Sequence, residues 1–207
     1  MKICEMFKSI QGEGLMIGAL TFFVRTAGCN LDCSWCDTQY SKQKGTEVSV
    51  DNIISEIGDC RNVCLTGGEP LLQDEIYPLM EKLLKKGKCV VLETNGSMDI
   101  SKVPKDPNMI ISMDIKCPSS GMEEGMMLSN MDILKKTDQL KFVVSNGGDF
   151  EYALLLLKEK PVKCTIIFSP VGGMDIEPLA EEVIERNLDV RVMPQLHKII
   201  WGNKRGV

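Results

Sequence analysis

The stretch "GCNLDCSWCDTQY", Gly28 to Tyr40, places three cysteines at positions 29, 33 and 36. Cysteine thiolates are soft ligands that bind zinc or iron–sulfur clusters, and four ligands complete either kind of centre. Three thiolates leave one coordination position without a cysteine from this stretch. The spacing therefore predicts a metal centre whose fourth position is filled from elsewhere in the chain or is open to an exogenous ligand.

Two kinds of centre fit the three cysteines. A structural zinc site needs a fourth protein ligand, and His197, the sole histidine, could complete a Cys3His set. A cubane iron–sulfur cluster held by three thiolates leaves one iron open, which indicates chemistry at the cluster. The cysteines alone leave both possibilities open.

Composition limits the class of protein. The 207 residues are 43% hydrophobic, which predicts a single domain over residues 1–207. The net charge of −5 and the lack of basic or acidic blocks argue against a nucleic-acid partner. Because the chain has neither a long apolar run nor a signal-peptide pattern, we expect no membrane partner and a cytoplasmic location. Nine cysteines in a reducing compartment act as core residues, ligands or reactive groups.

Short β-branched apolar runs alternate with amphipathic helical patterns along the chain. Strands are expected at 2–7, 20–26, 62–65, 89–93, 109–113, 140–145, 164–168 and 188–193, and helices at 51–57, 71–86, 149–158 and 177–186. This alternation predicts an α/β fold with a mainly parallel sheet. The pattern alone does not distinguish a doubly wound sheet from a barrel or partial barrel.

Polar and glycine-rich clusters follow nearly every expected strand. They are "IQGEG", "AGCNLDC", "TGGEP", "ETNG", "DIKCPSSG", "SNGG", "SPVGG" and "QLHK". The carboxyl ends of parallel strands lie at one edge of a sheet, where α/β proteins build their sites. We therefore expect these clusters to converge on one cavity.

The cysteine pattern Cys-x3-Cys-x2-Cys, with Trp35 before the last cysteine and "TGGEP" at Thr66 to Pro70, resembles the radical S-adenosylmethionine superfamily. A wider set of motifs is similar to the 7-carboxy-7-deazaguanine synthase family: "SIQGEG", "FVRTAGCNLDCSWCDT", "ETNGS", "DIKCPSSG" and "QLHK". This resemblance implies an incomplete (β/α) barrel with a mainly parallel sheet and a homodimer.

The resemblance also implies an activity. Cys29, Cys33 and Cys36 hold a [4Fe-4S] cluster whose open iron binds S-adenosyl-L-methionine, and one electron from a donor such as flavodoxin or ferredoxin leads to a 5′-deoxyadenosyl radical. The implied substrate is 6-carboxy-5,6,7,8-tetrahydropterin. Its ring contracts with loss of ammonia to give 7-carboxy-7-deazaguanine, on the route to the queuosine or archaeosine type of tRNA modification.

The resemblance assigns roles to residues of this chain, none of them as a catalytic group. Arg25 offers a guanidinium fork for the substrate carboxylate, and Thr38 offers a hard oxygen to Mg2+. S-adenosylmethionine contacts are implied for Trp35, Cys36, Asp37, Gly68, Ser112, Asp114, Lys116 and Ser169. Substrate contacts are implied for Ile10, Gln11, Gly12, Glu13, Arg25, Thr66, Glu93, Asn95 and His197.

Plainer interpretations remain open for single residues and for the whole chain. Arg25 could form a surface salt bridge, Thr38 could bond only the cysteine loop, and Asn95 could serve a turn. The C-terminal "WGNKRGV" receives no role. A glycyl-radical activase shares the cysteine triad but acts on a partner protein, and a zinc-stabilised binding module is a third possibility. "QGEG" and Thr38 argue against the activase.

Overall fold

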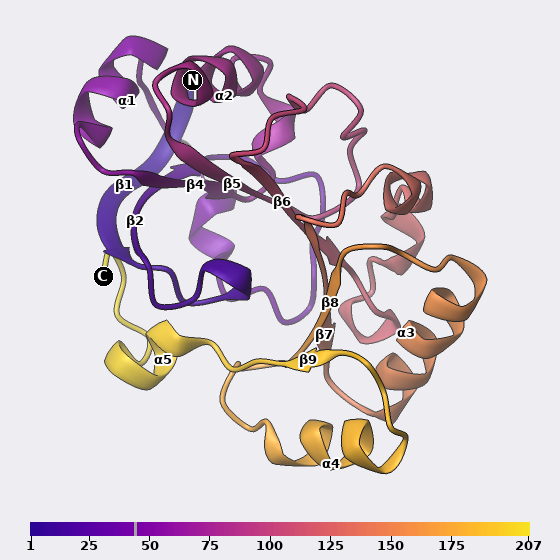
Figure 1. Cartoon of the computed structure of the whole chain (residues 1–207). Helices are drawn as coiled ribbons and strands as arrows, with labels where there is room; N and C mark the ends of the chain where they lie inside the picture. Colours follow the sequence, from indigo (N-terminus) through magenta and orange to yellow (C-terminus); the bar gives the residue numbers. More distant parts are fainter. Residues whose placement is uncertain (44) are drawn as a thin grey trace.

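The computed structural model describes residues 1–43 and 45–207, and its framework is one curved sheet. Within these residues the strand order is β3-β1-β2-β4-β5-β6-β7-β8-β9, and Figure 1 shows the strands as an open arc. All pairs from β2 to β9 are parallel, whereas β1 is antiparallel to both β2 and β3. The strands are β1 (Lys2–Ile10), β2 (Leu20–Thr26), β3 (Thr46–Glu47), β4 (Asn62–Gly67), β5 (Cys89–Thr94), β6 (Met109–Ile115), β7 (Gln139–Val144), β8 (Thr165–Pro170) and β9 (Arg191–Val192).

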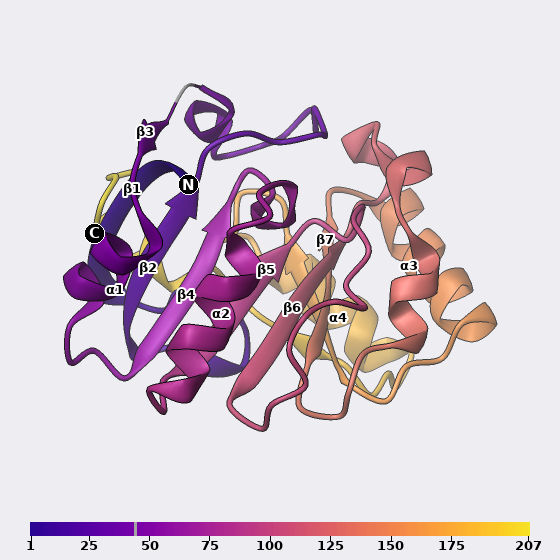
Figure 2. The same ribbon diagram turned by 90° about the horizontal axis from the view of Figure 1, so that it is seen from above.

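Four α-helices lie outside the arc, and a fifth lies across its open side (Figure 1). They are α1 (Val50–Ile57), α2 (Ile76–Lys85), α3 (Gly147–Glu159), α4 (Glu177–Glu185) and, across the open side, α5 (Leu196–Trp201). Short 3-10 helices occur at Gly14–Met16, Gln39–Lys42, Pro70–Leu72, Pro118–Ser120, Glu123–Gly125 and Leu128–Asp132. Figure 2 shows α2 lying along β4 and β5. Among the helices described, none has the length and apolar character needed to cross a membrane.

The two faces of the sheet differ in chemistry because side chains alternate along each strand. On the outer face, Leu65 of β4 and Leu92 of β5 are fully buried in the same core as Leu79 of α2. On the inner face of the same strands, Thr66 and Glu93 line a cavity. The outer face therefore supplies the hydrophobic stability, while the inner face is left for polar function.

The expected incomplete barrel with a mainly parallel sheet is confirmed. The expected helix at 71–86 begins later, at Ile76, because the Glu69 side chain accepts the Leu71 N–H and opens a separate short turn. Gln73 then leaves the helical path, since its Nε2 donates to the carbonyls of Lys2 and Ala27. The expected strand at 188–193 is reduced to β9, and α5 was not predicted.

Replacing Leu92 with Ala tests the outer core. Leu92 has no exposed surface, so we expect the free energy of unfolding to fall by about 2–5 kcal/mol through lost burial and a residual cavity. Urea unfolding at constant cofactor load measures this change. Leu155→Ala is the matched control, because its side chain is 60% exposed and the expected change is within about 0.5 kcal/mol. Equal effects at both positions would contradict this description of the core.

Candidate active site

A cavity of about 640 Å³ lies inside the arc, at the carboxyl ends of the parallel strands. Its walls come from every strand-end cluster except "SNGG", so the expected convergence occurs. All the residues implied as metal-, cofactor- or substrate-binding line it except Ser112. The C-terminal residues Gly202 to Val207 also line it, which was not predicted.

The cysteine loop is docked firmly on the chain that follows β6. Ser34 Oγ donates to the Ser120 carbonyl at 2.9 Å, and Trp35 Nε1 donates to Ser119 Oγ at 3.1 Å. Cys33 packs in a small apolar cluster that includes Leu31 and Met126. These contacts fix the loop from both ends, so the three thiols are presented to the cavity by an ordered backbone.

Two glycines allow the loop after β4 to touch the cysteine loop. A side chain at Gly68 would meet the Gly28 carbonyl oxygen at 2.2 Å and Cys29 Cβ at 2.7 Å. Gly67 has φ +154°, a conformation that side chains rarely adopt, and a side chain there would also collide with Thr26. The Glu69 N–H then donates to the Gly28 carbonyl at 2.9 Å. The "TGGEP" backbone is therefore held directly against Cys29.

The thiols fit a cluster better than a single metal ion. Cys29, Cys33 and Cys36 all line the cavity, and all are free thiols. Across residues 1–43 and 45–207, no three His, Cys, Asp or Glu side chains meet as a site for one metal ion. Zinc would need its ligand sulfurs about 2.3 Å from one point. In a cubane each thiolate binds a different iron, so the sulfurs need not converge.

Arg25 and Glu5 form a charged pair in the cavity wall. The two residues face each other across β1 and β2, and Arg25 Nε donates to Glu5 Oε1 at 2.7 Å. Tyr40 Oη donates to the same oxygen at 2.9 Å. Burial opposes the charge on Arg25, but the hydrogen bond to Glu5 outweighs it and raises the pKa of the guanidinium. Burial chiefly raises the pKa of Tyr40 to about 12, so its phenol remains a donor.

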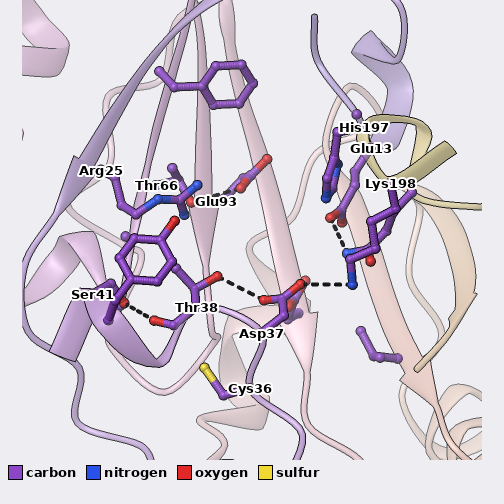
Figure 3. Close-up of a pocket in the computed structure, with 18 of the residues that line it drawn as sticks. Glu13, Arg25, Cys36, Asp37, Thr38, Ser41, Thr66, Glu93, His197 and Lys198 are labelled. Atoms are coloured by element: carbon purple, nitrogen blue, oxygen red, sulfur yellow. Dashed lines mark hydrogen bonds and ion pairs between the residues drawn. The ribbon is translucent and has the colours of Figure 1, made fainter. Parts of the chain in front are cut away.

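Glu93 supplies an acceptor next to Arg25. Its carboxylate accepts from Thr66 Oγ1 at 2.9 Å and from Gln11 Nε2 at 3.3 Å. Figure 3 shows Arg25, Thr66 and Glu93 on one wall of the cavity. A cation and an anion held side by side in this way can bind a ligand that carries both a carboxylate and hydrogen-bond donors.

A chain of ion pairs runs across the cavity. Lys141 Nζ lies 2.5 Å from Glu13 Oε2 and 3.2 Å from Asp114 Oδ1, and Lys116 Nζ lies 2.8 Å from Asp114 Oδ2. Burial disfavours the charged form of each of these four side chains, but the attraction between oppositely charged neighbours is stronger than the effect of burial. Lys141 thus holds the pKa of Glu13 below its ordinary value, and Asp114 followed by Glu13 raises the pKa of Lys141. All four side chains are therefore ionised.

The segment with α5 closes the open side of the cavity. The Leu196 N–H donates to the Gly12 carbonyl at 2.9 Å, and the His197 ring packs where a side chain at Gly12 would be. Lys198 Nζ lies 3.4 Å from Asp37 Oδ2, and Thr38 Oγ1 donates to Asp37 Oδ1 at 2.8 Å, as Figure 3 shows. This segment therefore joins the "QGEG" loop to the cysteine loop.

Ser112 and Asn95 lie differently from the other implied residues. Ser112 is buried on the inner face of β6, where its hydroxyl accepts from Gln139 Nε2 at 2.7 Å. Asn95 lines the cavity, but its amide is bonded to Ser97, Asn30 and Cys29. The structure thus brings Asn95 to the cysteine loop. Ser112 lies on the same inner face of β6 as Asp114, but two residues nearer the start of the strand, where it is bonded to Gln139 and does not line the cavity.

Sequence reasoning missed several residues of the cavity. Lys141 is a charge inside an apolar strand, "QLKFVV", and that contrast was a usable signal. Glu5 stands similarly in β1. Tyr40 and Lys198 are the last residues of "GCNLDCSWCDTQY" and "QLHK", and the sequence pointed to these stretches without giving either residue a role. Arg205 lies in "WGNKRGV", to which no role was given. Arg205 lies with its Cζ 3.8 Å from the centre of the Tyr40 ring.

The open parallel arc and its cysteine loop define a radical S-adenosylmethionine protein. The family model described as "Radical SAM superfamily" matches residues 23–112, which include the three cysteines and "TGGEP". Proteins of this superfamily carry a [4Fe-4S] cluster and use S-adenosylmethionine, and the thiols described above fit that cluster.

Relatives identify the family more narrowly. The 7-carboxy-7-deazaguanine synthase of Methanospirillum hungatei is 45% identical over 97% of this chain and 85% of its own length. That of Clostridium acetobutylicum is 42% identical over 100% of this chain and 99% of its own length. The crystal structure of QueE from Escherichia coli superposes with a TM-score of 0.76 at 27% identity, over 95% and 94% of the two chains. The chain belongs to the 7-carboxy-7-deazaguanine synthase family.

Replacing Lys141 with Met tests the ion-pair chain. Because the pKa of Glu13 is lowered in the fold, its ion pair stabilises the protein above the ordinary glutamate pKa and is lost as the pH falls. We expect the variant to lose about 3–5 kcal/mol at neutral pH, since two carboxylates lose a buried partner. The loss should be smaller near pH 4, where the carboxylates can bind protons.

Urea unfolding at several pH values measures this dependence. Lys163→Met, at an exposed lysine, is the control and should change stability little at any pH. A loss at Lys141 that does not vary with pH would show that packing, not charge, accounts for the effect.

Proposed function

We propose that this enzyme converts 6-carboxy-5,6,7,8-tetrahydropterin to 7-carboxy-7-deazaguanine with release of ammonia. The observation that carries this proposal is the presence, in one cavity, of three free thiols and of Arg25 and Glu93 on the same wall. Relatives that match the chain over nearly its whole length bear the corresponding name. A pterin acid has the complementary groups, a carboxylate for the arginine and ring N–H groups for the glutamate.

Cys29, Cys33 and Cys36 would hold the cluster, and S-adenosylmethionine would lie beside it. When bound, this pair supplies one-electron chemistry that removes a hydrogen atom from carbon. The chain's own contribution is position and exclusion of water, because a reactive carbon radical needs its target close by. The α5 segment supports that role, since it closes the open side of the cavity.

Arg25 would bind the substrate carboxylate. The Arg25 Nε–H already donates to Glu5, so the two terminal guanidinium nitrogens are left for a bidentate contact with the carboxylate. Gln11, Thr66 and Glu93 form a hydrogen-bonded group that suits the pterin edge. Further contacts are proposed for the Ile10 to Glu13 segment and for His197, which all line the same cavity.

S-adenosylmethionine would bind on the cluster side of the cavity. Gly68 lies against Cys29 with no side chain, so its backbone is available to the methionine group. The other proposed contacts line the cavity around it: Trp35, Cys36, Asp37, Asp114, Lys116 and Ser169. Ser112 would act indirectly, through its hydrogen bond with Gln139.

Thr38 would contribute a hydroxyl ligand to Mg2+. Magnesium keeps several waters and needs few protein oxygens, and substrate oxygens would complete the shell. Asp37 lies next to Thr38 and accepts its hydrogen bond, so a carboxylate is at hand to orient a ligand or a bound water. We propose that the ion enters together with the substrate.

The electron would come from a flavodoxin or ferredoxin, and the product would feed 7-deazapurine synthesis for queuosine- or archaeosine-type tRNA modification. We infer a homodimer from the family resemblance. All nine cysteines are free thiols, which supports a reducing compartment such as the cytoplasm.

Product analysis tests the proposed reaction. The cluster is reconstituted without oxygen, the pterin acid and S-adenosylmethionine are added with a reductant, and 7-carboxy-7-deazaguanine is sought by mass. Cys33→Ala should lose the brown colour and form no 5′-deoxyadenosine, because the cluster lacks a ligand. Cys164→Ala, at a buried thiol outside the cavity, is the matched control and should retain both. A Cys33 variant that still cleaves S-adenosylmethionine would refute the assignment.

Replacing Arg25 with Lys tests the substrate carboxylate contact. Lysine keeps the charge but not the fork, so we expect KM for the pterin acid to rise about 10- to 100-fold. Cleavage of S-adenosylmethionine without substrate should be unchanged, because Arg25 lies on the substrate wall. Steady-state kinetics and uncoupled cleavage measure the two effects. An unchanged KM would place the substrate carboxylate elsewhere.

A further inference from the structure

Asn95, directly after β5, lies beside the first cysteine of the triad. Its Nδ2 is 3.7 Å from Cys29 Sγ and 3.1 Å from Asn30 Oδ1. An amide nitrogen carries two N–H donors, and these two acceptors account for both. A sulfur atom accepts hydrogen bonds at longer distances than oxygen does, so 3.7 Å is a contact distance for an N–H···S bond.

The orientation of the Asn95 amide is fixed by its other end. Oδ1 accepts the backbone N–H of Ser97 at 2.9 Å and the Ser97 hydroxyl at 2.6 Å. A backbone N–H can only donate, so the amide oxygen must face Ser97. The amino group must then face Cys29, and a flipped amide is excluded.

The three thiols differ in the donors they receive. Cys29 Sγ also accepts from the Leu31 N–H at 3.5 Å, so two N–H groups point at this one sulfur. In the part of the chain that the structure describes, no N–H donor reaches the sulfur of Cys33 or Cys36. Among the three cysteines, Cys29 is therefore the one whose sulfur accepts N–H hydrogen bonds within the described residues.

We propose that Asn95 donates a hydrogen bond to the Cys29 thiolate of the bound cluster and thereby raises the reduction potential of that cluster. Hydrogen bonds to ligand sulfurs are among the factors that set such potentials. The reduced cluster carries one more negative charge, received from an external one-electron donor, and an N–H dipole aimed at the sulfur stabilises that charge. This inference rests on the cluster of the proposed function but not on its substrate.

Two variants separate this role from the turn that Asn95 forms. Asn95→Ser removes the amide N–H donor without adding charge, and its shorter side chain has a hydroxyl that is able to accept the Ser97 N–H within the same turn. Asn95→Asp keeps the acceptor for Ser97 but places a carboxylate oxygen near the sulfur. Asn62→Asp is the matched control, because Asn62 begins β4 at the opposite edge of the sheet from the cysteines.

The test is a redox titration of the reconstituted proteins with dithionite and mediators, without substrate, followed by the EPR signal of the reduced cluster. We expect the midpoint potential of Asn95→Ser to shift to more negative values than wild type, that of Asn95→Asp to shift further, and that of Asn62→Asp to stay at the wild-type value. Wild-type potentials in both Asn95 variants, with full iron and sulfide content, would overturn the inference while leaving the proposed function intact.

A second measurement needs no variant at position 95. Asparagine labelled with ¹⁵N only in its side-chain amide is incorporated into an Asn30→Ala protein, which lacks the neighbouring amide. Pulsed EPR of the reduced cluster should then detect a ¹⁵N coupling, and its absence would overturn the inference. A wild-type protein that binds no cluster at all would instead defeat the proposed function.

Discussion

The contact between the backbone at Gly68 and the backbone at Gly28 is the constraint on which the site depends. The two segments approach so closely that a single methyl group at Gly68 would overlap the Gly28 carbonyl oxygen. That closeness lets the Glu69 N–H reach the same carbonyl. Cys29 is thereby fixed relative to the end of β4, and the start of the cysteine loop becomes part of the sheet edge rather than a free loop.

Glu69 extends this constraint to the next strand. Its carboxylate is fully buried, accepts from Thr94 Oγ1 and from the Asn95 N–H at 2.7 Å, and so ties the end of β4 to the end of β5. Burial raises the pKa of Glu69, and the hydrogen bonds from Asn95 and Leu71 oppose that rise. A buried carboxylate with so many donors is a rigid link. Through it Asn95 is held beside the very cysteine that Gly68 positions, so the environment of the Cys29 sulfur follows from backbone geometry on two adjacent strands.

The sequence was sufficient for the framework and for most of the cavity wall. Strand periodicity and strand-end clusters placed Gly68 and Glu93 at one edge because parallel strands end together. That reasoning does not hold for Gln11, because β1 is antiparallel and ends beside the start of β2; Gln11 joins the cavity through its hydrogen bond to Glu93. What it could not provide was contact between segments far apart in the chain. The ion pairs of Lys141 depend on how far the arc curves, and the path of residues 202–207 depends on where α5 ends. Ser112 lies on the inner face of β6, as the motif implied, but a short motif does not tell how deep along the strand the cavity reaches or that Gln139 of β7 bonds the Ser112 hydroxyl.

An incomplete barrel has to join its two edges without strand pairing, and polar contacts across the cavity do so here. Gln139 of β7 accepts the Leu15 N–H at 2.7 Å, an approach that Gly14 permits because a side chain there would overlap the Gln139 amide. Lys141, two residues along the same strand, reaches Glu13. Because these contacts cross the interior, charged groups must be buried there, and each must be paired to remain ionised. The same pairs that hold the open arc together therefore give the cavity its charged walls, which suits a small, polar, charged substrate more than an apolar one.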